Sequence, residues 1–250
     1  MTYPQALIFD VDGTLADTER DGHRLAFNRA FADAGLDWNW SIDLYGKLLE
    51  VTGGKERIQH YVKTYLPDFD APEDLPSFAL KLHKSKTKHY KQIVEEGGIP
   101  LRPGVRRLIE SARDQNVRLA IATTTTPENV TALLQAALAP DSVDWFEQIA
   151  AGDIVPKKKP APDIYDYILK ELNLDPKDCL AFEDSQQGLK SSLGANLKTV
   201  ITRNDYTRDH NFSGAALVIS DFGEPDAPFE VISGDAGKAQ YFDLALASRM

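Results

Sequence analysis

The sequence has few of the features that mark secreted, membrane-spanning or nucleic-acid-binding proteins. Its 250 residues include one cysteine, Cys179, so no disulfide can form within the chain, which fits a reducing compartment. No apolar run approaches the roughly 20 residues that a membrane-spanning helix requires. The formal net charge is −10, and the basic residues form no stripe interleaved with aromatics, which disfavours nucleic acid as a partner.

The first ten residues, MTYPQALIFD, lack the basic-then-apolar layout of a signal peptide. We therefore expect a cytoplasmic protein, or a protein of the plastid stroma from which a transit peptide has been removed. No sequence feature indicates a membrane or a partner protein. The remaining functional class is a protein that acts on a small molecule.

Short, continuous apolar runs predict buried parallel strands covered on both faces. The runs are residues 6–11, 117–123, 179–184, 198–202 and 216–219. Apolar stripes at helical spacing lie between them, at residues 105–112, 130–138 and 164–172. This alternation predicts an α/β fold with a doubly wound parallel sheet.

The segment between the first two predicted strands is almost wholly helical in pattern, with stripes at residues 25–34, 58–66 and 90–94. The chain returns from this segment to the predicted sheet through Gly97 and Gly98, which are flexible, and through a proline-rich stretch. We predict an α/β core of residues 1–16 and 98–250, interrupted after strand one by a helical insertion of residues 17–97. A short helix is expected at residues 236–248, without an assigned role.

Polar residues follow the predicted strands where ligands bind in open α/β sheets, beyond the carboxyl ends. They are Asp10 and Asp12, Thr123 and Thr124, and Glu183 and Asp184. Four carboxylates at one edge repel one another unless a cation neutralises them, and an oxygen-only set suits Mg²⁺. Such a cation keeps coordination sites for water and a phosphate oxygen, so a phosphate ester is the expected ligand.

Two further stretches agree with an anionic ligand. Lys157 to Lys159 directly precede a predicted helix start, where the helix dipole disfavours cations unless an anion also binds. The run TTTT, which includes Thr124 and Thr125, offers hydroxyl and backbone N–H donors of the kind that phosphates use.

Each of these features also has an ordinary explanation. The DxD pattern occurs in simple turns, TTTT and the ED pair occur at helix starts, and KKK is common in solvated loops. Their occurrence together, in this order and at one edge of the sheet, favours phosphate chemistry.

The motifs FDVDGT (9–14), IAT ending in Thr123, KKKPAPD with Lys159, and FEDS (182–185) resemble the four ordered motifs of the haloacid dehalogenase superfamily. The resemblance implies a Rossmann-like core, a mobile helical cap after strand one, and Mg²⁺ as cofactor. It also implies that Asp10 is the nucleophile and a metal ligand. Asp12 would be the general acid and base, with its backbone carbonyl on the metal. Thr123 and Lys159 would hold the phosphoryl group, and Glu183 and Asp184 would complete the metal site.

The helical insertion offers residues for a second phosphate. TGGKERI (52–58) places Gly53 and Gly54 before Lys55 and Arg57 at a helix start. HKSKTKHY (83–90) carries Lys86 between two further lysines, and a solvated helix face explains this stretch equally well.

Residues 17–28, 44–58 and 155–165 are particularly similar to the CbbY family. Its members are phosphatases that remove xylulose-1,5-bisphosphate, an inhibitor of the Calvin-cycle enzyme Rubisco. The resemblance implies that Asp10 attacks one phosphate of a sugar bisphosphate while the basic insertion residues hold the other. Glu19 would contact sugar hydroxyls.

Three alternatives remain. One is a β-phosphoglucomutase-like enzyme, although that family has a histidine where alignment without gaps places Gly22, and His23 lies one position away. The others are a sugar-monophosphate phosphatase and a non-catalytic phosphosugar-binding protein.

Overall fold

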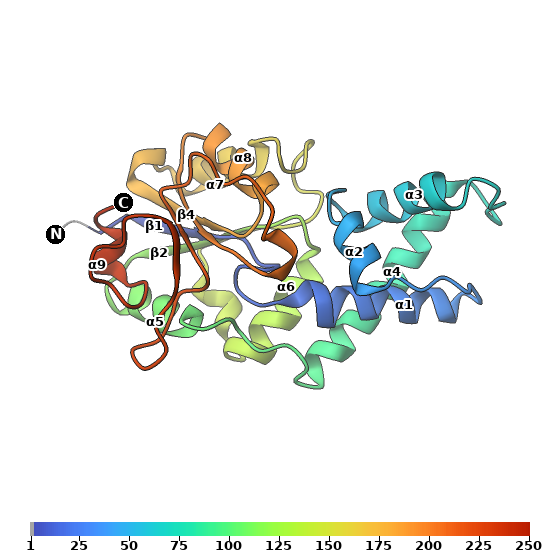
Figure 1. The fold of residues 1–250 in the computed structure, drawn as a ribbon, viewed down its shortest axis with the longest axis horizontal. Helices are drawn as coiled ribbons and strands as arrows, with labels where there is room; N and C mark the ends of the chain where they lie inside the picture. Colours follow the sequence, from blue (N-terminus) through green and yellow to red (C-terminus); the bar gives the residue numbers. More distant parts are fainter. Residues whose placement is uncertain (1–2) are drawn as a thin grey trace.

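A computed structural model describes residues 3–250 and contains a seven-stranded sheet in the order β3-β2-β1-β4-β5-β6-β7 (Figure 1). The strands are β1 (Ala6–Phe9), β2 (Arg118–Ala122), β3 (Gln148–Ala150), β4 (Cys179–Glu183), β5 (Lys198–Thr202), β6 (Leu217–Ile219) and β7 (Val231–Gly234). All neighbours pair in parallel except β6 and β7. The five predicted strands are confirmed. The prediction did not include β3 and β7, which are short, and β7 is largely exposed.

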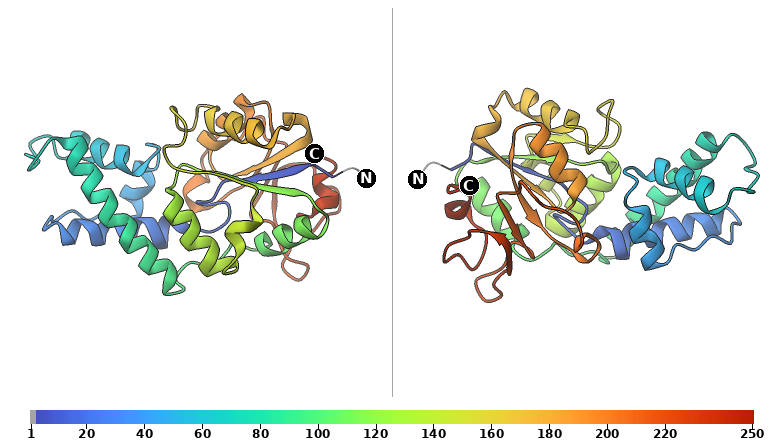
Figure 2. Two further views of the ribbon diagram at one scale, coloured as in Figure 1. Left: turned by 180° about the vertical axis from the view of Figure 1, so that it is seen from behind. Right: turned by 45° about the horizontal axis from the view of Figure 1, so that its top comes forward.

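Helices cover both faces of the sheet, which confirms the doubly wound α/β class (Figures 1 and 2). They are α5 (Val105–Asp114), α6 (Pro127–Leu133), α7 (Asp163–Leu172), α8 (Gln186–Gly194) and α9 (Leu244–Ala247). Leu7 and Phe9 of β1 pack in the cluster that contains α5 and α6, whereas Ala6 and Ile8 pack in the cluster that contains α7. Because side chains alternate along a strand, a wholly apolar β1 serves both layers.

Shorter helical turns connect these elements: η2 (Leu134–Leu138), η3 (Ser142–Trp145), η4 (Pro176–Asp178) and η5 (Asp205–Thr207). The expected helix at 236–248 is wrong in its extent, because only Leu244–Ala247 is helical. Gly237 has a φ of +60°, and Asp243 accepts a hydrogen bond from the Leu246 N–H as the cap of a new helix. Both features prevent a helix from running through this segment. Within residues 3–250, no helix is both long and apolar enough to cross a membrane.

The elements between residues 19 and 95 are all helices: η1 (Glu19–His23), α1 (Arg24–Asp33), α2 (Ile42–Leu48), α3 (Gly54–Tyr65) and α4 (Leu75–Glu95). They lie to one side of the sheet in every view (Figures 1 and 2). An aromatic-rich cluster that includes Phe27, Phe31, Trp40 and Tyr45 fills their interior. Helix α4 is about 30 Å long. Its first half packs in this cluster, and its last turns pack on the sheet's helices through Tyr90 and its neighbours.

The two connections between the sheet and the helical insertion pair with each other. Ala16 and Leu101 form an antiparallel bridge, and the backbone N–H of Arg102 donates to the carbonyl of Leu15 at 2.9 Å. The buried guanidinium of Arg102 also donates to the carbonyls of Gly13, Arg203 (3.0 Å) and Ser220 (2.5 Å). One side chain thus ties the loop after β1 to the ends of β5 and β6.

We predict that Arg102→Ala lowers the free energy of unfolding by about 3 kcal/mol or more, since it leaves several buried carbonyls without a donor. Arg208→Ala is the control, because Arg208 is exposed and, among the described residues, forms an ion pair with Asp205 alone. It should cost about 0.5 kcal/mol or less. Urea unfolding measures both values. Equal losses in the two variants would contradict this role for Arg102.

Candidate active site

The loop after β1 brings Asp10 and Asp12 to the carboxyl edge of the sheet. The backbone N–H of Asp10 donates to the carbonyl of Phe182 on β4 at 2.9 Å, which fixes the start of this loop. Gly13 has a φ of +83°, and a Cβ there would lie 2.3 Å from Oδ2 of Asp184. Only glycine permits this close approach of the two loops.

Lys159 is the centre of a buried ion network. Its Nζ donates to Oδ1 of Asp10 at 2.7 Å, to Oε1 of Glu183 at 2.5 Å and to the carbonyl of Ala122 at 2.8 Å. All three ammonium protons therefore have acceptors. Burial alone would lower the pKa of Lys159, but the two carboxylates outweigh burial and raise it above its ordinary value. The hydroxyl of Tyr165 also donates to Oε1 of Glu183, at 2.5 Å.

Asp10, Glu183 and Asp184 form a buried acidic cluster, in which one oxygen of each lies within 4.8 Å of the others. Burial, together with the neighbouring carboxylates, raises the pKa of Asp10 to about 8 despite Lys159. The pKa of Asp184 is also raised, by burial and by Asp10. Oε2 of Glu183 is buried without a hydrogen-bond partner among residues 3–250. An oxygen-only, charge-repelling set with an unpartnered oxygen fits a hard divalent cation.

The carboxylate of Asp12 does not belong to this cluster. Its Oδ1 accepts hydrogen bonds from the Thr18 hydroxyl at 2.5 Å and from Nε2 of His23 at 2.9 Å. Burial would raise the pKa of Asp12, but His23 and then Thr18 lower it to about 2. The two aspartates, which are separated by one residue, thus lie in separate environments that shift their pKa values in opposite directions.

Lys86, which reaches this region from α4, sets the tautomer of His23. Its buried Nζ lies 2.7 Å from Nδ1 of the histidine. Because an ammonium can only donate, Nδ1 is the acceptor and the ring proton is on Nε2, facing Asp12. Burial lowers the pKa of Lys86 to about 8. Lys86 therefore lies inside the structure and is not part of a solvated helix face.

The alignment without gaps, which placed Gly22 at the histidine of the mutases, did not reveal that His23 contacts Asp12. Residues Glu19–His23 form a π-helical turn, which accommodates one more residue than an α-helical turn and directs His23 to Asp12. Gly22 itself packs so closely that a Cβ would lie 2.4 Å from Ile99. The offset of one residue is therefore not an argument against a mutase-like arrangement, contrary to the sequence-based interpretation.

The threonine run lies beside the ion network. Thr123 is buried and follows Ala122, whose carbonyl accepts from Lys159. The Thr123 hydroxyl accepts from the Thr125 N–H at 3.3 Å, and the Thr125 hydroxyl accepts from Asn129 at 3.2 Å. Thr124, which lies between Thr123 and Thr125 in the chain, is half-buried.

Two of the residues expected to bind substrate, Glu19 and Arg57, meet at Tyr45. The Tyr45 hydroxyl donates to Oε2 of Glu19 at 2.5 Å and accepts from Nη1 of Arg57 at 3.0 Å. Tyr45 and Arg57 are buried. The sequence pattern did not single out Tyr45, because a lone tyrosine in a helical segment is typical of a core residue.

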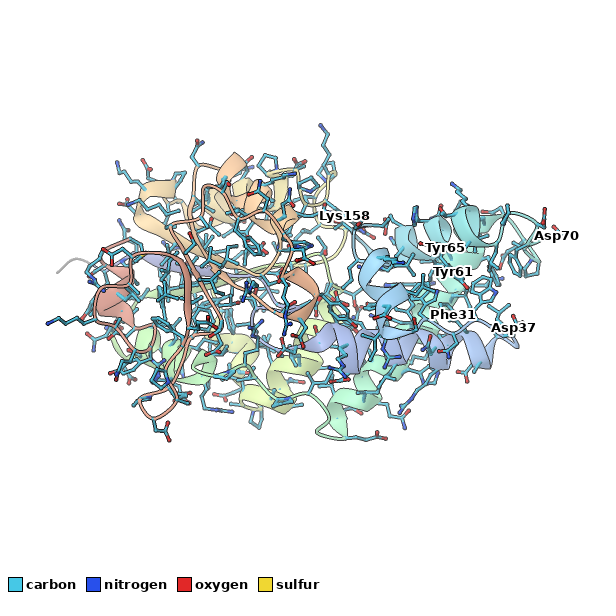
Figure 3. All side chains as sticks on the ribbon, in the orientation of Figure 1. Phe31, Asp37, Tyr61, Tyr65, Asp70 and Lys158 are labelled. Carbon is cyan, nitrogen blue, oxygen red and sulfur yellow. The ribbon has the colours of Figure 1, made fainter. Side chains whose placement is uncertain are left out.

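Lys55 makes a different contact. Its Nζ donates to Oδ2 of Asp153 in the core at 2.5 Å, and Lys158 binds both Asp153 (3.0 Å) and Glu56 (3.1 Å). Lys158 lies where the core faces the helical insertion (Figure 3). Gly53 has a φ of +95°, and a Cβ there would lie 2.8 Å from Nζ of Lys158, while Gly54 lies against the His83 ring. Gly53 and Lys55 therefore join α3 to the core, whereas Gly54 packs α3 against α4 within the insertion. None of the three lies in the acidic cluster.

A family profile for haloacid dehalogenase-like hydrolases matches residues 4–196. The chain belongs to this family. CbbY of Cupriavidus necator is 48% identical over 224 residues, which cover 90% of this chain and 88% of that protein. A CBBY-like protein of Arabidopsis thaliana is 40% identical, over 90% of this chain and 71% of its own length.

A crystal structure of a mutant CbbY from Rhodobacter sphaeroides, in complex with xylulose-1,5-bisphosphate, is similar in fold. Its TM-score is 0.80 at 43% identity, and the match covers 88% of this chain and 95% of that one. Taken with the family profile, these relatives identify the chain as a CbbY-like phosphatase of the haloacid dehalogenase-like hydrolases.

We predict that Asp184→Asn abolishes the rise in melting temperature that Mg²⁺ gives the wild type, while leaving the metal-free melting temperature unchanged or higher. The substitution removes one of three mutually repelling carboxylates but keeps an oxygen that can accept from Asn204. Thermal unfolding with EDTA and with Mg²⁺ measures both effects. An undiminished Mg²⁺ response in the variant would contradict a metal site at the acidic cluster.

Proposed function

We propose that this protein is a Mg²⁺-dependent phosphatase that hydrolyses xylulose-1,5-bisphosphate to xylulose 5-phosphate through an aspartyl-phosphate on Asp10. The observation that carries the proposal is that the two aspartates have separate partners. Lys159 binds Asp10 in the acidic cluster, and His23 binds Asp12 outside it. The CbbY relatives support sugar phosphates as the substrate class, and the complex of the Rhodobacter sphaeroides protein supports this bisphosphate.

The metal would be held by the carboxylates of Asp10, Glu183 and Asp184 and by the backbone carbonyl of Asp12. When bound, it supplies positive charge for the phosphoryl oxygens. Lys159, together with Thr123 and the neighbouring Thr124 and Thr125, would bind the same phosphoryl group.

The reaction would take two displacements. Asp10 attacks phosphorus, the bond from phosphorus to the sugar oxygen breaks, and Asp12 donates a proton to that oxygen. Asp12 then takes a proton from water, whose oxygen attacks phosphorus and releases Asp10 and inorganic phosphate. With its pKa at about 2, Asp12 is a carboxylate at neutral pH, which is the form that the second step requires. The first step requires a proton on Asp12, and Oδ2 can carry it because the hydrogen bonds from His23 and Thr18 both end at Oδ1.

We further propose that residues 17–97 act as a cap domain that selects the sugar. The half-buried Glu19 and the buried Tyr45 and Arg57 combine a carboxylate for hydroxyl groups with a guanidinium for the second phosphate. Lys86 would act through His23, and Gly53 and Lys55 would hold the cap against the core. Gly54 would pack α3 against α4 within the cap.

In this role the protein would remove a Rubisco inhibitor formed alongside the Calvin cycle. The compartment we propose is the cytoplasm or, because a relative occurs in the plant Arabidopsis thaliana, the plastid stroma.

The proposal predicts that phosphate release with Mg²⁺ is faster from xylulose-1,5-bisphosphate than from ribulose-1,5-bisphosphate or from hexose and pentose monophosphates. Asp10→Asn should lose at least about 1000-fold in kcat, because a carboxamide is a poor nucleophile. A phosphate-release assay over this panel measures both. Turnover of a hexose monophosphate alone would contradict the substrate, and full activity of Asp10→Asn would contradict the nucleophile.

For the second phosphate, we predict that Arg57→Gln raises KM for the bisphosphate at least about tenfold and changes KM for a monophosphate by less than about threefold. Lys63→Gln is the matched control, because Lys63 is an exposed cation on the same helix. Steady-state kinetics on variants with a normal melting temperature give the result. An equal change in KM for the two substrates would show that Arg57 does not bind the second phosphate.

A sugar phosphomutase is the second candidate, and the contact between His23 and Asp12 is the observation that favours it. The same panel decides between the two candidates when isomer interconversion is followed beside free phosphate. Phosphate release without isomerisation excludes the mutase.

A further inference from the structure

The turn η5 links the acidic cluster to the helical insertion. We propose that Asn204 is a positioning residue for Asp184, and that packing of Tyr206 against the helical insertion holds Asn204 in place. Metal binding at the acidic cluster would thereby depend on whether the insertion is docked. The inference rests on the proposed metal site, although its tests need no substrate.

Asn204 is fixed at both ends of its amide. Its Nδ2 donates to Oδ2 of Asp184 at 2.7 Å, and its Oδ1 accepts from the backbone N–H of Tyr206 at 3.0 Å. Its own backbone N–H donates to the Thr207 hydroxyl at 3.0 Å. Because a backbone N–H can only donate, the amide oxygen must face the turn and the amide nitrogen must face Asp184. The turn itself therefore sets the donor that Asp184 receives.

The space around this hydrogen bond is closed by the loop after β1. A Cβ at Gly13 would lie 2.6 Å from Nδ2 of Asn204 and 2.3 Å from Oδ2 of Asp184. The loop that carries Asp10 and Asp12 thus packs directly on the bond between Asn204 and Asp184. A shift of the amide would change the position of Asp184 relative to the other two carboxylates of the acidic cluster.

Tyr206 connects the same turn to the helical insertion. Among the described residues, it is the one member of the core that packs in the insertion's aromatic cluster. A Cβ at Gly46 on α2 would lie 3.1 Å from Cδ1 of Tyr206, and the Tyr206 and Tyr45 rings are 6.2 Å apart. The Tyr206 hydroxyl is buried and has no hydrogen-bond partner within residues 3–250. The contact is therefore made by the ring.

The contact joins the two halves of the proposed site. Tyr45, which borders the Tyr206 ring, also holds Glu19 and Arg57. Movement of the insertion away from the core would expose the Tyr206 ring and remove apolar contacts that stabilise the turn. Asn204 would then lose the support that orients its amide toward Asp184.

The first test is the affinity for Mn²⁺, which electron paramagnetic resonance measures with the metal alone. Groups that orient metal ligands typically change affinity by about 10-fold to 100-fold when removed, so Asn204→Ala should weaken Mn²⁺ binding within that range. Arg208→Ala is the control from the same stretch, and it should bind Mn²⁺ as the wild type does. Within residues 3–250, the Arg208 side chain forms one exposed ion pair, with Asp205 at 2.6 Å. Wild-type affinity in Asn204→Ala overturns the proposal.

The second test perturbs the insertion side of the contact. Gly46→Leu adds a side chain on α2 that displaces the Tyr206 ring. It should weaken Mn²⁺ binding at least about threefold in the protein that retains Asn204, and should not weaken it further in Asn204→Ala. Lys47→Leu adds the same side chain at an exposed position of α2 and should have no effect in either protein. Tyr206→Ala should reproduce Gly46→Leu, and Tyr206→Phe should keep wild-type affinity because the ring remains.

Equal effects of Gly46→Leu with and without Asn204, or no effect in either, would show that the insertion does not act on the metal site through this turn. None of these measurements involves a sugar phosphate. Failure of the substrate assay and failure of this coupling are therefore separate results.

Discussion

The site depends on one ammonium group buried among carboxylates. Lys159 donates to Asp10 and Glu183, and it is itself stable there only because both carboxylates are present. Removing one partner of such a set leaves an uncompensated buried charge, which is strongly destabilising. The same group that balances the charge of the resting site lies where a transferring phosphoryl group must be bound. Folding and phosphate chemistry therefore constrain the same residues.

The second constraint is the separation of Asp10 from Asp12. They are two residues apart in the sequence, yet burial raises the pKa of one while the contacts of His23 and Thr18 lower that of the other. The residues that create this difference come from the start of the helical insertion, and Lys86 of α4 fixes the histidine. Groups of the insertion are thus part of the environment of the core chemistry, and the insertion contributes more than a cover over the sheet.

The sequence predicts the sheet well, because its strands are apolar on both faces and because polar residues directly follow them. For the same reason it predicts that Asp10, Glu183 and Asp184 come together, and the resemblance of KKKPAPD to a family motif adds Lys159 to them. It cannot predict contacts made by residues whose local pattern is ordinary. Tyr45 looks like a core aromatic, and Asn204 looks like a turn residue. His23 reaches Asp12 only because the helix at Glu19–His23 is π-helical, a change of register that spacing does not reveal.

The central claim is that Asp10 is the group that takes the phosphoryl group. Its most direct test is acid quenching of the enzyme during turnover of xylulose-1,5-bisphosphate labelled with ³²P, followed by peptide mapping. Our account predicts an acid-stable, hydroxylamine-labile acyl phosphate on the peptide that contains Asp10, and none in Asp10→Asn. Turnover without a labelled peptide, or a label on another residue, would contradict it.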